Sequence, residues 1–333
     1  MQPTVVTILS TNFAGSHFLS LLLGSHSKSI HLGEIRHLAD GMCSRMRACW
    51  HCDPPERCPI VRNVRPREIG SIYRTIYANL VEDGLEKWAF IDTSKKVSWA
   101  KRFIGNEDFR FKYVYLVRDP RALVRRWLIG NNSIRRSCHR RYKAVFRGPS
   151  FRPWLTFAPQ WKIWAYKWLD KNVEIANFLD SHRLDHQLVT YYDLASDTTS
   201  EVMRLMRWIG LDFEPGQLEY WNVQQHGDEK PEYEWVKQQK KQGHIDLRWK
   251  DFLSTDICNA VMSQPPIVAL LDRLSLVAGP CGLSRRLAKT AACEILPFDA
   301  RRTQRAAMGD EAIDSASMAG DHKAFRPPAA KAA

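Results

Sequence analysis

Residues 4–34, TVVTILSTNFAGSHFLSLLLGSHSKSIHLGE, decide the fold of this chain. They open with an uncharged, β-branched run at residues 5–9, which is typical of a strand buried on both faces. A loop of small residues around Gly15 follows, and an apolar run at residues 18–23 then predicts a helix that ends near Gly24. This order forms a cradle for phosphate, because the free N–H groups and the positive dipole end of the helix face the loop.

The loop lacks the lysine of the nucleotide-binding pattern G-x-x-x-x-G-K-[ST], since no Lys follows Gly15. This absence counts against an ATP or GTP site. A different phosphate-bearing ligand is therefore expected in the cradle.

The length and net charge of the chain limit the number of domains and the kind of partner that we expect. A chain of 333 residues can bury a large core, and one α/β domain with insertions fits it better than two domains. The formal net charge of +13 favours anionic partners. We expect no secretory signal, because Thr4 already begins the first strand. No run of 18 apolar residues is present, so we expect no membrane span and a cytoplasmic location.

Strand-like and helix-like segments alternate along the chain. Further strands are expected at residues 88–91, 111–117 and 186–191, and residues 30–35 are either a second strand or an extended turn that carries Glu34. Helices are expected at residues 69–86, 98–104, 120–127, 159–179, 201–209 and 247–261. We therefore predict an α/β fold, a three-layer sandwich like that of the P-loop NTPases, with a central parallel sheet and helices on both faces. Ligands of such sheets bind where the strands end, so the loops after the strands should meet there.

Residues 118–169 are the most basic region, with 13 Lys or Arg against the single acid Asp119. We interpret the aromatic-rich segment at residues 159–179 as a core helix. Residues 128–158 are interpreted as a basic and aromatic lid region. Its portion at residues 135–152 is either a mobile lid over an anionic ligand or a solvated basic face. Nucleic-acid binding is not expected, because no motif for it is present.

A cysteine-rich insertion is predicted at about residues 40–66. Four of the eight cysteines fall there, at Cys43, Cys49, Cys52 and Cys58. The C-W-H-C of residues 49–52 has the spacing of a zinc knuckle, which Cys58 or His51 could complete. A disulfide and reduced thiols are the alternatives, and reduced thiols are the default in the cytosol.

From about Ser284 onward, Ala, Arg, Ser and Pro dominate without an apolar period. We therefore predict one domain at residues 1–283 and a disordered tail at residues 284–333.

Six segments, in this order, resemble the sulfotransferases that use 3′-phosphoadenosine 5′-phosphosulfate (PAPS), and together they span residues 4 to about 275. They are NFAGSHFLSLLLGSH, LGEI, DTSK, VYLVRDPRAL, VTYYDL with WIGLDFEP, and IDLRWKDFL. The resemblance is greatest to bacterial sulfotransferases of carbohydrate or unknown acceptors and to protein-tyrosine sulfotransferases. It implies PAPS as the sulfuryl donor and an acceptor with a hydroxyl group, and it requires no metal.

The resemblance also assigns residues to the sulfuryl donor. The loop that would hold the 5′-phosphosulfate comprises Asn12, Phe13, Ala14, Gly15, Ser16, His17 and Phe18. Its usual form is R-S-G-T/S-T, so Phe13 replaces the usual arginine. Arg118 matches the arginine that holds the 3′-phosphate, and its planar guanidinium suits that role. Arg126 stands where a serine is usual; the alternative for Arg118 is a surface ion pair with Asp119.

Three residues are expected to take part in chemistry by the same resemblance. Glu34 matches a glutamate that acts as general base on the acceptor hydroxyl. Lys95 would neutralise the charge that grows on the leaving oxygen, and His17 is a further acid–base candidate. The acceptor is expected to be a carbohydrate or glycolipid hydroxyl, with tyrosine or a small metabolite as alternatives. A nucleotide-dependent kinase and a non-catalytic relative that binds anionic ligands are the competing functions.

Overall fold

The computed structural model describes residues 2–39, 52, 57–65, 68–130, 133–146, 151–226, 240 and 243–285. All of them belong to one compact unit that spans Met1–Ala291. The predicted tail lies outside the described residues except for its first two, Ser284 and Arg285, which belong to a short strand.

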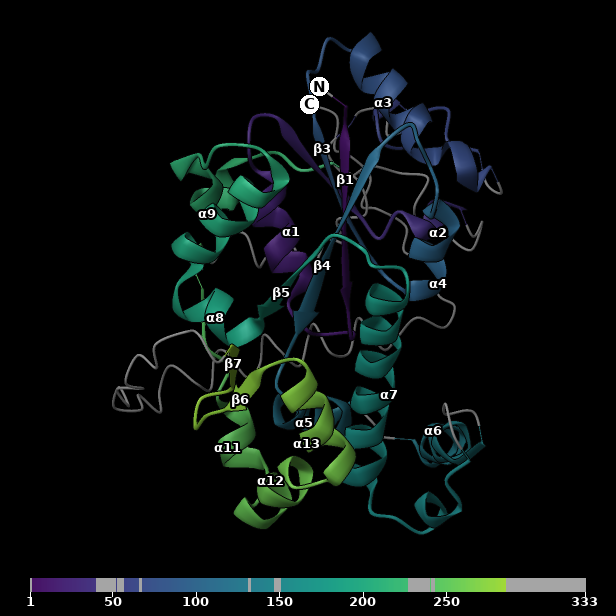
Figure 1. Ribbon diagram of the computed structural model, residues 1–333, viewed down its shortest axis with the longest axis vertical. Helices are drawn as coiled ribbons and strands as arrows, with labels where there is room; N and C mark the ends of the chain where they lie inside the picture. The colour runs from purple at the N-terminus through teal and green to yellow at the C-terminus, as the bar shows by residue number, and fades with distance from the viewer. Residues whose placement is uncertain are drawn as a thin grey trace, which may run out of the picture. The chain divides into compact units, whose positions relative to one another are not determined.

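A five-stranded parallel sheet forms the centre of the fold, in the order β2-β3-β1-β4-β5 (Figure 1). The strands are β1 (Thr4–Ser10), β2 (Ser29–Gly33), β3 (Ala89–Lys95), β4 (Arg110–Val117) and β5 (His186–Thr190). The strand β1 is buried along its whole length, as its uncharged sequence predicts. A small antiparallel pair, β6 (Leu276–Ala278) and β7 (Leu283–Arg285), follows later in the chain.

Helices cover both faces of the sheet (Figure 1). The α-helices are α1 (Ser16–Gly24), α2 (Arg36–Ala39), α3 (Ile72–Glu82), α4 (Val97–Ala100), α5 (Pro120–Ile129), α6 (Ile134–Phe146), α7 (Gln160–Ser181), α8 (Tyr191–Ser196), α9 (Thr198–Ile209), α11 (Arg248–Phe252), α12 (Thr255–Met262) and α13 (Pro265–Arg273). The 3-10 helices are η2 (Ile69–Ser71), η3 (Lys101–Phe103), η4 (Pro153–Thr156) and η5 (Pro215–Asn222). The predicted α/β sandwich with a central parallel sheet is therefore confirmed.

Alternate side chains of β4 enter opposite layers of the core. Val114 and Leu116 pack with the apolar residues of α1 and α9. Tyr113 and Tyr115 point to the other face, where α5 and α7 lie. Tyr115 donates a hydrogen bond to the backbone oxygen of Asn172 in α7 (2.9 Å), and burial raises the pKa of its phenol far above the ordinary value. The predicted aromatic core helix is α7, whose Trp164 and Trp168 are buried.

Several predicted boundaries differ from the structure. The strand expected at residues 88–91 continues to Lys95, because the buried Asp92 carboxylate accepts hydrogen bonds from Tyr73 (2.7 Å) and Trp99 (2.8 Å). The helix expected at residues 247–261 is two helices, α11 and α12. It breaks at Ser254, whose hydroxyl accepts a hydrogen bond from the Ile257 N–H (3.3 Å) and caps α12. The sequence analysis also missed α13 and the β6–β7 pair.

The predicted lid region contains α6, which is held to the segment before α7. The Arg141 guanidinium donates to the carbonyl oxygens of Leu155 (3.0 Å) and Ala158 (2.6 Å). Across the described ranges, no helix is both long enough and apolar enough to cross a membrane.

Candidate functional site

The carboxyl ends of the strands meet at one edge of the sheet (Figure 1). Leu9 pairs with Lys95 across β1 and β3, and Ser10 pairs with Leu116 across β1 and β4. The loop after β1, the end of β3 and Arg118 after β4 are therefore neighbours, as the sequence predicts.

The loop after β1 has the backbone of a phosphate cradle. Gly15 adopts the left-handed conformation (φ 97°) immediately before α1, and Phe13 also has a positive φ of 67°. Within the part of the chain that the structure describes, the buried hydroxyls of Ser10 and Thr11 have no hydrogen-bond partner. Buried polar groups are normally satisfied, so these two hydroxyls fit a site that binds a polar ligand.

Tyr191 joins the loop to the rest of the site. A Cβ placed on Gly15 would lie 2.7 Å from Cδ2 of Tyr191, so only glycine allows this close approach. The Tyr191 hydroxyl donates to the backbone oxygen of His244 (2.8 Å), and the Arg118 guanidinium carbon lies 4.2 Å from the centre of the Tyr191 ring. One aromatic ring therefore contacts the loop, the arginine after β4 and the segment before α11.

The Arg118 side chain points across the edge of the sheet where the strands end, and it does not form an ion pair with Asp119, its neighbour in sequence. Its guanidinium donates to the backbone oxygen of Phe13 (2.7 Å) and to the Asp246 carboxylate (2.5 Å). The Asp119 carboxylate instead caps α5 by accepting from the Arg121 N–H (2.8 Å) and pairs with the Arg121 side chain. The alternative of an Arg118–Asp119 surface ion pair is therefore wrong.

Four guanidinium groups gather around this point. They belong to Arg118, Arg125, Arg126 and Arg248. Burial, followed by the charges of the other three, lowers the pKa of Arg126 to about 10. Burial and the charge of Arg248 likewise lower the pKa of Arg125. Mutual repulsion of this kind is relieved when an anion binds among the cations.

Two carboxylates partly offset these four charges. Asp246 pairs with Arg118 and, at 2.8 Å, with Nε of Arg248. Burial raises the pKa of Asp246, but its hydrogen bond to Arg248 and the charges of both arginines outweigh burial and hold this pKa well below the ordinary value. The charge of Asp251 raises the pKa of Arg125, against the larger effects of burial and of Arg248. Four cations against two carboxylates leave a local surplus of positive charge.

The two departures from the usual family pattern are in direct contact with each other. The Arg126 guanidinium carbon lies 4.5 Å from the centre of the Phe13 ring, within the range of a cation–π interaction. Position 13 has a phenyl ring where the pattern that the sequence resembles has arginine, and position 126 has a guanidinium where that pattern has serine. The structure thus places a guanidinium from α5 against the loop that lacks its own arginine.

Glu34 and Lys95 are also brought together. Glu34 follows β2 directly, and its carboxylate pairs with the Lys95 ammonium and with Arg36 (3.0 Å). Burial raises the pKa of Glu34, but the charge and hydrogen bond of Lys95 outweigh it, with help from His37 and Arg36, and the net pKa lies below the ordinary value. Lys95 has a positive φ of 62°, a backbone conformation that often marks functional sites when it is held by a non-glycine residue.

His17, in the first turn of α1, packs edge-on against the buried His31 of β2, with ring centroids 5.4 Å apart. Asp193 of α8 accepts hydrogen bonds from the backbone N–H (3.2 Å) and the side chain (3.0 Å) of Arg285.

Sequence reasoning did not single out Asp246, Arg248, Arg125 or Tyr191. Asp246 and Arg248 lie in the segment IDLRWKDFL, which carried part of the resemblance but no assigned role. Only the fold shows that this segment returns to the end of β4.

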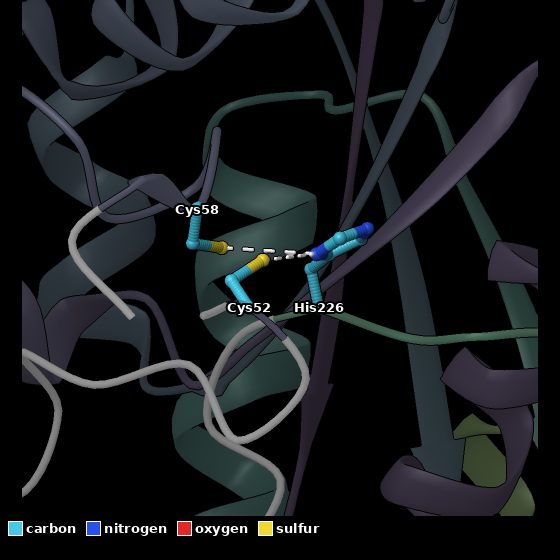
Figure 2. A group of neighbouring side chains, drawn as sticks. All are labelled: Cys52, Cys58 and His226. Carbon is cyan, nitrogen blue, oxygen red and sulfur yellow. Dashed lines mark hydrogen bonds between the residues drawn. The ribbon is translucent and has the colours of Figure 1, made fainter. Parts of the chain in front are cut away.

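Of the residues predicted for zinc, Cys49 lies outside the described part of the chain, as does His51. Cys52 and Cys58 lie together beside His226, which the sequence did not single out (Figure 2).

Comparison with known proteins gives structural likenesses only. Neither the models of protein families nor the curated proteins contain a match to this chain. The sulfotransferase domain from the curacin biosynthetic pathway is 16% identical, with a TM-score of 0.48, and the match covers 79% of this chain and 97% of that one. The sulfotransferase domain of the Synechococcus PCC 7002 olefin synthase is 16% identical, with a TM-score of 0.46 and coverage of 82% and 95%.

A sulfotransferase from Alicyclobacillus acidocaldarius is 13% identical, with a TM-score of 0.39 and coverage of 66% and 89%. All three carry the name of the family that the sequence resembles. At these identities and scores, the function of this chain has to be inferred from its own site residues.

The contact of Gly15 with Tyr191 can be tested by comparing two glycines of similar conformation. Gly15→Ala should lower the free energy of unfolding by about 2–4 kcal/mol, from left-handed strain plus the clash with the Tyr191 ring. Gly210→Ala is the control, because Gly210 has a φ of 100° but open space around it, and it should lose only about 1–2 kcal/mol. Urea unfolding measures both values, and equal losses would show that the Tyr191 contact costs nothing.

Proposed function

We propose that this chain is a sulfotransferase that moves a sulfuryl group from PAPS to an acceptor hydroxyl. The observation that carries the proposal is the arginine cluster (Arg118, Arg125, Arg126 and Arg248) beside a phosphate cradle that has no P-loop lysine. The sulfuryl donor carries two separate phosphate-type groups. A cradle and a neighbouring cationic cluster match such a ligand better than the single chain of phosphates in ATP.

The two anionic ends of the sulfuryl donor are assigned to different parts of the site. The 5′-phosphosulfate lies in the loop of Asn12, Phe13, Ala14, Gly15, Ser16, His17 and Phe18, where backbone N–H groups and the Ser16 hydroxyl contact its oxygens. The 3′-phosphate binds Arg118, with Arg126 and Arg248 nearby. Arg126 also supplies the cation that Phe13 removes from the loop, which its contact with the Phe13 ring supports.

The proposed chemistry is an in-line displacement at sulfur. The acceptor oxygen forms a bond to sulfur while the bond from sulfur to the bridging phosphate oxygen breaks, and adenosine 3′,5′-bisphosphate leaves. Glu34 takes the proton of the acceptor hydroxyl, and Lys95 offsets the charge on the departing oxygen. The pairing of Glu34 with Lys95 at the carboxyl ends of the strands supports these two roles; the lowered pKa keeps the Glu34 carboxylate ionised but makes it a weaker base than an ordinary glutamate.

The acceptor is assigned by resemblance as a carbohydrate or glycolipid hydroxyl. His17 is retained as an acid–base candidate, because it lies in the first turn of α1 next to the loop. No step of this chemistry calls on a metal.

Titration of the reaction product adenosine 3′,5′-bisphosphate, without added metal, tests the donor site. Calorimetry should show micromolar binding to the wild type, and Arg118→Ala should weaken it about 10- to 100-fold through loss of a charge-assisted contact. Arg110→Ala is the matched control. Arg110 begins the same strand that Arg118 follows, at the opposite edge of the sheet, and is exposed, so binding should not change. No binding to the wild type at about 1 mM would refute the proposal.

Changing the residues at positions 13 and 126, singly and together, tests whether Arg126 replaces the missing arginine of the proposed donor loop. Arg126→Ser should weaken binding of the bisphosphate about 10-fold, because it removes the guanidinium beside the loop. Adding Phe13→Arg restores the arrangement usual in the family and should recover most of the affinity. The same titrations on Phe13→Arg alone complete a double-mutant cycle. A double variant that binds no better than Arg126→Ser would show that the two positions are not exchangeable.

Glu34→Gln tests the general base. It should lower turnover of PAPS about 100-fold or more with any acceptor that the wild type uses, while binding of the bisphosphate stays the same. Because the pKa of Glu34 lies below its ordinary value, the loss of wild-type turnover in acid should set in below the pH range in which an ordinary glutamate titrates. Lys95→Met removes the cation that lowers this pKa, so the acid limb should move to higher pH. Equal turnover in Glu34→Gln would remove Glu34 from the mechanism.

A further inference from the structure

A group of two cysteines and one histidine lies away from the arginine cluster. The Sγ atoms of Cys52 and Cys58 and a ring nitrogen of His226 all lie within 4.8 Å of one another. Nδ1 of His226 is 3.4 Å from Sγ of Cys52 and 3.8 Å from Sγ of Cys58. Figure 2 shows both sulfur atoms pointing toward the imidazole ring. Neither cysteine takes part in a disulfide.

These distances match one face of a zinc coordination tetrahedron. Zinc bonds of about 2.3 Å to sulfur and about 2.0–2.1 Å to nitrogen place sulfur and nitrogen ligands about 3.6 Å apart. The two measured sulfur–nitrogen distances lie on either side of this value. The ligand atoms are therefore close to the positions that the ion would require.

Hydrogen bonding alone explains the arrangement less well. The Nδ1 atom of a neutral imidazole either donates one hydrogen bond or accepts one, yet two thiols point at it. A shared ion between the three atoms accounts for two thiols that point at one ring nitrogen. Two thiolates and an imidazole are a donor set that suits zinc.

Two of the three residues, Cys58 and His226, lie in parts of the fold that hydrogen bonds hold in place. Cys58 is fully buried, and its carbonyl oxygen accepts from the N–H groups of Val61 (3.0 Å) and Arg62 (2.8 Å) in a tight turn. Asn79 of α3 fastens that turn by donating to the carbonyl oxygen of Pro59 (2.9 Å). Its attachment to α3 gives Cys58 a fixed position.

His226 reaches the cysteines from a distant part of the sequence. The preceding residue, Gln225, is buried and donates to the hydroxyl of Ser25 at the end of α1 (2.9 Å). The cysteines belong to the insertion between β2 and β3, whereas His226 follows η5. An ion at this point would cross-link two loops whose ligands Cys58 and His226 are 168 residues apart in the chain.

We propose that Cys52, Cys58 and His226 form a structural zinc site that fastens the insertion to the segment after η5. A fourth ligand completes the tetrahedron. The ion has no part in sulfuryl transfer, so the site is independent of the function proposed above.

Metal analysis of the purified full chain tests the site directly. Plasma mass spectrometry of protein prepared without chelators should find about one zinc per chain in the wild type. Cys58→Ser and His226→Asn should both lose it. Cys258→Ser is the matched control, because Cys258 is also a buried thiol but lies on α12, and it should keep its zinc.

A second measurement uses the wild type alone and does not depend on how the variants fold. After zinc is stripped with a chelator, titration with Co²⁺ should give the visible absorption of tetrahedral, thiolate-bound cobalt, and zinc should abolish it. Returning zinc should raise the melting temperature of the stripped protein, because the ion binds the folded chain more tightly than the unfolded one.

Three results would overturn the proposal. The first is a wild type without zinc that also gives no cobalt spectrum. The second is retention of zinc by both Cys58→Ser and His226→Asn. The third is loss of zinc by Cys58→Ser but not by His226→Asn, which would place the ion on the insertion alone. None of these measurements depends on PAPS, so failure of the zinc site and failure of the sulfotransferase proposal can be told apart.

Discussion

The parallel pairing of β1 with β3 on one side and β4 on the other places the loop after β1, Lys95 and Arg118 side by side. In this register Lys95 lies beside Leu9, and Leu116 lies beside Ser10. The loop that leads into α1 therefore emerges between a lysine and an arginine. A parallel sheet can bring together the ends of distant strands because each crossover helix returns the chain to the same edge.

Charge is the second constraint on this edge. A cluster of four guanidinium groups is stable without a ligand only if counterions and stacking offset their repulsion. Asp246 pairs with two of them, and the rings of Tyr191 and Phe13 receive Arg118 and Arg126. These contacts hold the side chains in position before an anion arrives, so less conformational entropy is lost when it binds.

The contact between Phe13 and Arg126 changes how two unusual residues are understood. Taken separately, each replaces a residue that the family usually has, and each weakens the case for a donor site. Taken together, they keep one cation beside the loop, carried by α5 (Pro120–Ile129) instead of by the loop itself. The interaction with a phosphate depends on where the guanidinium lies. It matters less whether the loop or α5 carries that guanidinium.

The sequence by itself determined most of the strands and helices and the loop at Gly15, because periodicity and turn residues are local signals, whereas the candidates Glu34, Lys95 and Arg118 came from the resemblance to sulfotransferases. The sequence predicted one helix at residues 247–261, but Ser254 separates α11 from α12. The capping hydrogen bond of this one residue outweighs the helix propensity of its neighbours. Only the tertiary structure decided that Asp246 and Arg248 join Arg118, and that His226 meets Cys52 and Cys58. Those contacts form between loops that are far apart in the chain, and no local sequence pattern predicts which of these loops meet.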